Sequence, residues 1–276
     1  MRLLVAAALI SRSAGVRTSA GARALRSVRM STSAWDRTSL DRATQTITIT
    51  AAADEPSASI VILHGLGDTA QGWADVAAMW AGALPSARFV LPTAPLLPVT
   101  LNGGMRMPAW YDIARLDGDA DRQTCDGIGE SKATIDALVS REAALVGGAG
   151  RVVLAGFSQG GALALYAGLQ RESEPLAAVI SMSAYLPARG AWSVAPASRG
   201  VPVGFFHGDA DQVVRPSWAD MSVAELRGAQ QVAAVSLKTY VGMAHSATQE
   251  EISDVAAFMA RALGLGPPDA AAGSRL

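Results

Sequence analysis

The sequence predicts an α/β fold in which a mostly parallel central sheet carries helices on both faces. Three observations lead to this prediction. Short apolar segments alternate with segments of helical periodicity along the chain. Most of these apolar segments are hydrophobic nearly throughout, as are strands that are buried on both faces of a parallel sheet. Hydrophobic residues make up 50% of the 276 residues, enough for a sizeable core.

Seven segments are predicted as strands because β-branched and apolar residues dominate them. In the first, Thr and Ile alternate, which is typical of a half-exposed edge strand. The predicted strands are Thr46–Thr50, Ser59–Leu63, Arg88–Leu91, Val152–Ala155, Leu176–Met182, Val201–Phe206 and Val235–Tyr240.

Five segments between and after these strands have helical periodicity. They are Gln71–Leu84, Gly127–Val146, Gly160–Gln170, Ser217–Arg227 and Thr248–Leu263. Residues 92–113 contain several prolines and glycines and are predicted to form a long loop. In a sheet of this kind, functional sites lie at the carboxyl ends of the strands.

The first 35 residues differ from the rest of the chain in composition. They are rich in Arg, Ser and Ala, and the first acidic residue is Asp36. This is typical of a mitochondrial or plastid transit peptide, although a secretory signal, a disordered tail or a true start at Met30 are alternatives. We therefore expect an N-terminal extension over residues 1–44, a globular domain over 45–264 and a disordered tail over 265–276.

Composition also excludes some classes of function. The formal net charge is −1 without a basic stripe in the globular part, which argues against a nucleic-acid partner. No apolar run reaches the roughly 18–20 residues that span a bilayer. One cysteine, Cys125, excludes an intramolecular disulfide framework. With three scattered histidines it offers no metal cluster, so neither a metal nor a cofactor is expected.

The segment Gly156-Phe157-Ser158-Gln159-Gly160 matches the pattern G-x-S-x-G between a predicted strand and a predicted helix. This is the setting of a nucleophile elbow, a strained turn that presents a serine hydroxyl. The N–H groups at the start of the following helix, including that of Gln159, would face a developing oxyanion. A serine that merely caps the helix is the structural alternative, but the setting favours Ser158 as a nucleophile.

A serine hydroxyl needs a base, and the chain has three histidines. His64 follows a buried strand and is expected to hold its loop by hydrogen bonds, while the Leu66 N–H supplies a second oxyanion donor. His207 ends another strand and is expected to be a half-buried structural residue. His245 lies on the loop after the last strand, from which its imidazole can reach the nucleophile.

Two aspartates compete for the acid that orients this histidine. Asp209 and Asp211 both follow the strand Val201–Phe206, and either gives the chain order serine, aspartate, histidine that such a site requires. The acid must reach the imidazole nitrogen remote from the serine. Spacing alone leaves both residues open, with Asp211 preferred.

Taken together, these motifs resemble those of the acyl-protein thioesterase/lysophospholipase family of small carboxylesterases over roughly residues 59–263. The matching segments are Leu63–Asp68, Pro98–Asn102, Met107–Ile113, Gly156–Leu163, His207–Asp211, Lys238–Tyr240 and Gly242–His245. The resemblance implies an α/β-hydrolase fold, with Ser158 as nucleophile, Asp211 as acid and His245 as base. It also implies that the Leu66 and Gln159 amides form the oxyanion hole.

The resemblance further implies a cytosolic enzyme, a monomer or weak homodimer, that removes palmitate from S-acylated proteins and also hydrolyses lysophospholipids and simple esters. The Arg-rich N-terminal segment departs from the family pattern and puts this location in question. Two other functions remain open from the residues themselves. One is a short-chain carboxylesterase for small metabolite esters, and the other is a receptor that keeps the hydrolase fold and triad.

Apolar side chains in the predicted loop 92–113 suggest where an acyl chain would bind. We expect Leu97, Leu101, Met107 and Trp110 to line a groove for it. The alternative is that these side chains are ordinary core beneath a long loop.

Overall fold

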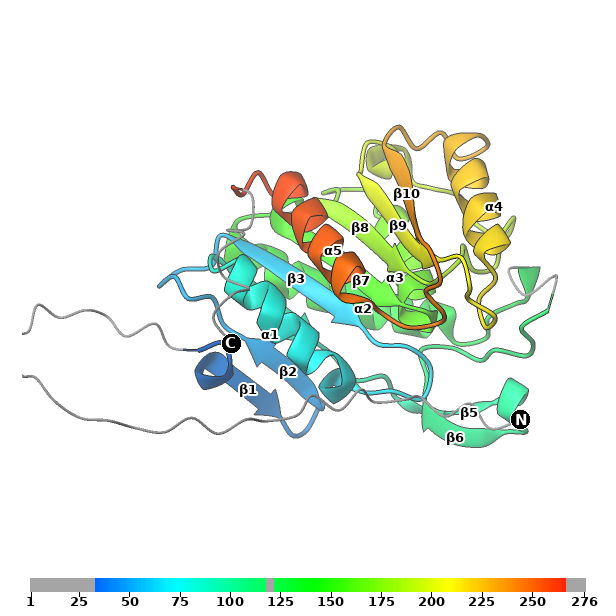
Figure 1. Ribbon diagram of the computed structural model, residues 1–276, viewed down its shortest axis with the longest axis horizontal. Helices are drawn as coiled ribbons and strands as arrows, with labels where there is room; N and C mark the ends of the chain where they lie inside the picture. Colours follow the sequence, from blue (N-terminus) through cyan, green and yellow to red (C-terminus); the bar gives the residue numbers. More distant parts are fainter. Residues whose placement is uncertain (1–32, 118–121, 267–276) are drawn as a thin grey trace, which may run out of the picture.

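The fold is a single central sheet between two layers of helices, as seen in Figure 1. A computed structural model describes residues 33–117 and 122–266. The strands are β1 (Thr38–Asp41), β2 (Thr46–Ile49), β3 (Ala58–Leu63), β4 (Ala87–Leu91), β7 (Val152–Phe157), β8 (Ala178–Met182), β9 (Val203–Gly208) and β10 (Val235–Tyr240). They lie in the order β1-β2-β4-β3-β7-β8-β9-β10. From β4 to β10 all neighbours are parallel, which confirms the predicted α/β class.

The helices follow the strands closely in the predicted order. They are α1 (Ala74–Ala83), α2 (Ile128–Val146), α3 (Gln159–Leu169), α4 (Pro216–Arg227) and α5 (Gln249–Ala262). Short 3₁₀ turns span Trp35–Arg37, Ala70–Trp73, Thr100–Asn102, Ala149–Arg151 and Pro196–Ser198. Within residues 33–117 and 122–266, no helix combines the length and apolar character that crossing a bilayer requires.

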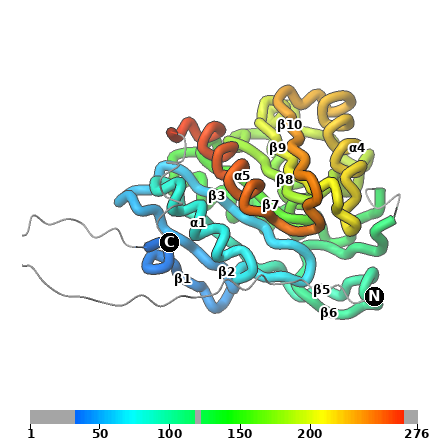
Figure 2. Tube along the Cα trace, viewed as in Figure 1, coloured from blue at the N-terminus to red at the C-terminus, as the bar shows by residue number. Residues whose placement is uncertain are grey.

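Two hydrophobic cores lie on opposite faces of the sheet. Val61 and Leu63 of β3 contribute to the core beneath α2, α3 and α4. Ile60 and Ile62 of the same strand contribute to the core beneath α1 and α5. Successive side chains of a strand point to opposite faces, so an uninterrupted apolar strand is what a sheet covered on both sides demands. Figure 2 follows the chain through these layers.

The sheet begins earlier than the sequence predicted. Thr46–Thr50 was expected to be an edge strand, but β2 pairs with β4 on one side and with β1 on the other. The edge is β1 (Thr38–Asp41), which is largely exposed and carries no apolar alternation that could reveal a strand. The predicted extension over residues 1–44 therefore contributes its last residues to the sheet, while residues 1–32 lie outside the described part.

The predicted loop over residues 92–113 also contains regular structure. Strands β5 (Leu96–Val99) and β6 (Met105–Pro108) form an antiparallel hairpin separate from the main sheet. Gly103 and Gly104 have φ values of 67° and 79° and form its turn, a conformation that glycine adopts without strain. Prolines suggested a loop, yet a two-stranded hairpin tolerates them on its free edges.

Candidate active site

Ser158 stands on a sharp turn between β7 and α3. Its φ and ψ values of 53° and −121° lie outside the regions that non-glycine residues favour. The turn is held because the Ser158 N–H donates to the Met182 carbonyl at the end of β8, 2.8 Å away. The sequence thus folds here into a strained strand–turn–helix that projects the serine from the carboxyl edge of the sheet.

Glycines let the backbone close around this turn. A Cβ on Gly156 would lie 2.3 Å from the carbonyl oxygen of Gly160, and a Cβ on Gly160 would lie 2.3 Å from the oxygen of Leu63. Real side chains essentially never approach backbone this closely, so both positions require glycine. The close approach brings the start of α3 against the end of β3.

Side chains from two further loops form a hydrogen-bonded chain that begins at the serine. His245 Nε2 lies 3.0 Å from Ser158 Oγ, and His245 Nδ1 lies 2.8 Å from Asp211 Oδ2. The Asp211 carboxylate can only accept, so Nδ1 carries the proton and Nε2 is free to accept from the serine hydroxyl. This is the geometry in which an imidazole acts as general base towards a hydroxyl.

The Asp211 carboxylate is fully engaged by donors. Its Oδ1 accepts from the Val213 and Val214 N–H groups, each at 2.9 Å. His207 Nε2 donates to the Val214 carbonyl at 2.9 Å and also lies 3.4 Å from Asp211 Oδ2. Burial alone would raise the pKa of Asp211, but hydrogen bonds from His207 and His245 hold it well below the usual range of an aspartate. The group therefore stays ionised beside the imidazole.

The structure separates the two competing aspartates. The Asp209 carboxylate is engaged elsewhere, since its Oδ1 accepts from the Gly242 N–H at 2.7 Å. It thereby holds the turn that leads to His245, while only Asp211 is hydrogen-bonded to that histidine. The distinction depends on side-chain direction over two residues of loop, which sequence spacing does not encode.

The two predicted oxyanion donors lie on segments next to the serine. Gln159 is the first residue of α3, where N–H groups lack intrahelical acceptors. A Cβ on Gly65, adjacent to Leu66, would lie 3.4 Å from Ser158 Cβ. Neither the Leu66 nor the Gln159 N–H donates to a backbone oxygen of the described residues. Both are thus available to an oxygen that develops beside Ser158.

His64 has the structural position that the sequence suggested. It is buried, its Nδ1 donates to the Gly65 carbonyl at 2.7 Å and its Nε2 accepts from the Ala94 N–H at 3.0 Å. Burial lowers the pKa of His64, against the opposing effects of the Gly65 hydrogen bond and the Asp68 charge. Because both ring nitrogens are hydrogen-bonded to backbone groups, the neutral ring holds the loop and has no nitrogen free to act as a base.

The four residues proposed for an acyl groove fall into two groups. Leu97 and Met107 face each other across the hairpin, and Leu101 packs against the same core as Leu66. All three are partly exposed. Trp110, in contrast, is only 1% exposed and its indole N–H donates to the His64 carbonyl at 2.8 Å. Its buried ring and engaged N–H make it a support of the site rather than an open groove wall.

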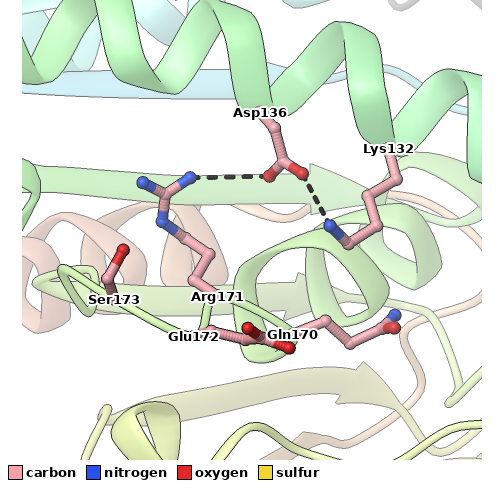
Figure 3. Close-up of a pocket in the computed structure, with 6 residues that line it drawn as sticks. All are labelled: Lys132, Asp136, Gln170, Arg171, Glu172 and Ser173. Atoms are coloured by element: carbon pink, nitrogen blue, oxygen red, sulfur yellow. Dashed lines mark hydrogen bonds and ion pairs between the residues drawn. The ribbon is translucent and has the colours of Figure 1, made fainter.

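A surface pocket elsewhere in the described structure contains none of these residues. Figure 3 shows it between α2 and the end of α3, where Asp136 joins Lys132 at 2.6 Å and Arg171 at 3.5 Å. Lys132 and Arg171 thus both pair with Asp136. The described residues also contain no group of three or more His, Cys, Asp or Glu side chains suited to a metal ion.

Sequence reasoning missed one side chain that contacts the base. The Phe157 ring lies 4.8 Å from the His245 ring and 5.3 Å from that of Trp73, centroid to centroid. Phe157 occupies a variable position of the G-x-S-x-G pattern, so the motif carries no signal for it. The ring therefore packs against the imidazole of the proposed base.

Comparison with known proteins supports the same assignment of fold and family. A model of the phospholipase/carboxylesterase family matches residues 44–263. Acyl-protein thioesterase 1 of Gibberella zeae is 38% identical over 222 residues, covering 77% of this chain and 93% of that protein. Acyl-protein thioesterase 1 of Mycosarcoma maydis is 40% identical over 223 residues, covering 76% and 92%. The crystal structure of Zea mays acyl-protein thioesterase 2 has a TM-score of 0.68 at 29% identity and covers 79% of this chain and 99% of that one.

Proposed function

The chain belongs to the phospholipase/carboxylesterase family of α/β-hydrolases, and we propose that it hydrolyses acyl thioesters and carboxylic esters through an acyl-serine on Ser158. The observation that carries this proposal is the continuous link from Ser158 Oγ through His245 to Asp211, at 3.0 Å and 2.8 Å. The names of the relatives support acyl thioesters as the substrate class. The site geometry supports a nucleophile and a base for their hydrolysis.

In the first step, Ser158 Oγ attacks the acyl carbonyl carbon while His245 Nε2 takes the hydroxyl proton. The carbonyl π bond becomes an oxyanion, which the Leu66 and Gln159 N–H groups stabilise. Asp211 stabilises the imidazolium without itself accepting the proton. Collapse of the tetrahedral intermediate breaks the bond to sulfur or oxygen, and His245 returns the proton to the leaving thiol or alcohol.

In the second step, water replaces the leaving group. His245 takes a proton from the water as its oxygen attacks the acyl-serine carbon, and the same two amides hold the second oxyanion. Collapse releases the carboxylic acid and returns the proton to Ser158. Each step uses only groups of this chain and water, and no metal or cofactor is part of the proposal.

The proposed substrate is an S-acylated protein, with lysophospholipids and simple esters as further substrates. Its support comes from the thioesterase relatives and from Leu97, Leu101 and Met107, whose apolar side chains lie on or beside the hairpin. Hydrophobic side chains on this hairpin favour an acyl chain over a small polar metabolite.

A panel of thioesters that differ only in chain length tests the function. Wild-type protein should hydrolyse palmitoyl thioester with a higher kcat/KM than acetyl thioester, and Ser158→Ala should lose turnover of both. Preference for acetyl would favour a short-chain carboxylesterase, and binding without turnover would favour a receptor. Substantial activity of pure Ser158→Ala would refute the assigned nucleophile.

Location and assembly are also proposals. We expect a cytoplasmic protein, as the resemblance implies, unless the Arg-rich residues 1–35 act as a mitochondrial or plastid presequence. Residues 1–32 lie outside those the structure describes. We expect a monomer or weak homodimer.

A further inference from the structure

The segment Pro108–Tyr111 connects the two chain segments that carry the proposed oxyanion donors. On one side it binds the loop of Leu66. The Gly67 N–H donates to the Pro108 carbonyl at 2.8 Å, and the Trp110 indole N–H donates to the His64 carbonyl at 2.8 Å. These two bonds bracket Leu66 in the sequence, so the direction of its N–H depends on them.

On the other side the same segment binds Gln159 through that residue's side chain. Gln159 Oε1 accepts from the Trp110 N–H at 3.0 Å, and Gln159 Nε2 donates to the Tyr111 carbonyl at 2.6 Å. The side chain is only 2% exposed and uses both ends of its amide on backbone groups. Because the side-chain amide of Gln159 is held at both ends, the backbone N–H of the same residue has little freedom to move.

The connecting segment itself is held from a third direction. The Ser131 hydroxyl of α2 donates to the Trp110 carbonyl. The Trp110 ring is buried against the His64 ring, with centroids 5.1 Å apart. Trp110 therefore uses its N–H, its carbonyl and its indole N–H on three different elements of the fold.

We propose that Trp110 and the Gln159 side chain are positioning residues that set the spacing between the Leu66 and Gln159 N–H groups. The inference rests on the proposed function, in which these two amides hold the oxyanion. The amides come from segments nearly a hundred residues apart, and Pro108–Tyr111 is hydrogen-bonded to both segments. Donors must lie about 2.7–3.1 Å from the oxyanion, so a small shift of either segment weakens catalysis.

Trp110→Phe tests this proposal because it removes one N–H and keeps an aromatic ring in the core. We expect kcat to fall about 10-fold, less than the 10²–10³-fold loss of a whole oxyanion donor, while KM for the palmitoyl thioester stays within about twofold. The inhibition constant of a palmityl trifluoromethyl ketone, which forms a tetrahedral oxyanion on the serine, should rise by the same factor as kcat falls.

Trp80→Phe is the matched control. Trp80 is also 1% exposed, and its indole N–H donates to the Ile252 carbonyl at 2.8 Å, on the opposite face of the sheet. Both variants should lower Tm by a similar amount. Trp80→Phe should leave kcat and the inhibition constant unchanged.

Gln159→Met provides a second test that removes both amide bonds at similar side-chain length. It should give the same pattern of lower kcat, weaker ketone inhibition and unchanged KM, and it decides the matter if Trp110→Phe does not fold. Wild-type kcat in either folded variant, or a loss confined to KM, would overturn the proposal. The proposed function fails on a different result, namely turnover by Ser158→Ala.

Discussion

Gly208 and the Met243 carbonyl are so close that no side chain fits between them: a Cβ on Gly208 would lie 1.9 Å from the Met243 oxygen. Gly208 ends β9 just before the loop of Asp211, and Met243 lies just before His245. The Ala210 N–H also donates to the Met243 carbonyl at 3.2 Å. The loops that carry the acid and the base are therefore packed backbone against backbone.

Gly208→Ala should lower both activity and stability, because its methyl group must push these two loops apart. We expect kcat/KM to fall at least about 10-fold and the free energy of unfolding to fall by about 1–3 kcal/mol. Gly82→Ala in α1 is the control, since a Cβ there meets nothing within 4 Å. It should keep full activity and gain up to about 1 kcal/mol from helix propensity. Equal activity of both variants would contradict the packing argument.

Asp211→Asn and Asp209→Asn should differ sharply in kcat. Asp211→Asn removes the charge that stabilises the imidazolium, and by analogy with other triads the loss is about 10⁴-fold. Asp209→Asn keeps a side-chain oxygen to accept from the Gly242 N–H, so we expect a loss of less than about 10-fold. Steady-state kinetics on one thioester measures both variants, and a greater loss in Asp209→Asn would reverse the assignment of the acid.

Met107→Ala should reduce the preference for long acyl chains. Met107 faces Leu97 across the hairpin, and its Sδ lies 3.7 Å from where a Cβ on Gly67 would be, beside the loop of Leu66. We expect kcat/KM for palmitoyl thioester to fall about 10-fold and that for acetyl thioester to change little. Leu145→Ala is the control, because Leu145 is 58% exposed near the end of α2, which precedes the start of β7, whereas Ser158 follows the end of that strand. An unchanged chain-length profile in Met107→Ala would exclude a groove at this hairpin.

Glu251→Gln should make stability less dependent on pH. Glu251 is buried and forms no ion pair among the described residues. Burial, together with the nearby Asp254 charge, raises the pKa of Glu251 from 4.5 to about 8, against the opposing effect of a hydrogen bond from the Thr248 backbone. Between these values the native state holds a proton that the unfolded state has lost, so stability falls as pH rises from about 4.5 to 8. Denaturant unfolding at about pH 5 and about pH 9 measures this decrease in the free energy of unfolding.

The glutamine introduced by Glu251→Gln cannot ionise, so the variant should exceed wild type in stability at about pH 9 by roughly 1–3 kcal/mol. Glu250→Gln is the control, because the Glu250 side chain is 70% exposed and its bond to Lys238 is a surface ion pair. It should change stability little at either pH. If the stability of Glu251→Gln falls with pH as steeply as that of wild type, another group causes the pH dependence.

The buried part of the fold was predictable because strands buried on both faces must be apolar throughout. Each strand of the main sheet from β3 to β10 was placed within a few residues by its apolar pattern. The strand β1 was missed, since Thr38–Asp41 lie at an exposed edge where no apolar alternation is required. The hairpin β5–β6 differs from the predicted loop because prolines and glycines give the same local signal in a short hairpin as in an irregular loop.

Individual residues of the candidate site were predictable from the sequence, but the contacts between them were not. Ser158, His245 and the proposed oxyanion donors lie at strand ends and glycine turns, which have local signatures. The choice between Asp209 and Asp211 required the direction of each side chain. The positions of two aromatic side chains depend on contacts between segments far apart in sequence, which no motif describes; they are Phe157 and Trp110. The sequence places the tryptophan beside the acyl chain because it lies in the long apolar segment 92–113, whose side chains were expected to line a groove.

Locating the covalent adduct tests directly whether Ser158 is the nucleophile. Wild-type protein would be treated with a fluorophosphonate, digested and analysed by peptide mass spectrometry. We predict one adduct, on Ser158 in the peptide that contains Gly156–Gly160, with loss of thioesterase activity in proportion to labelling. Full turnover after complete labelling of Ser158, or inactivation by an adduct on another residue, would show that Ser158 is not the nucleophile.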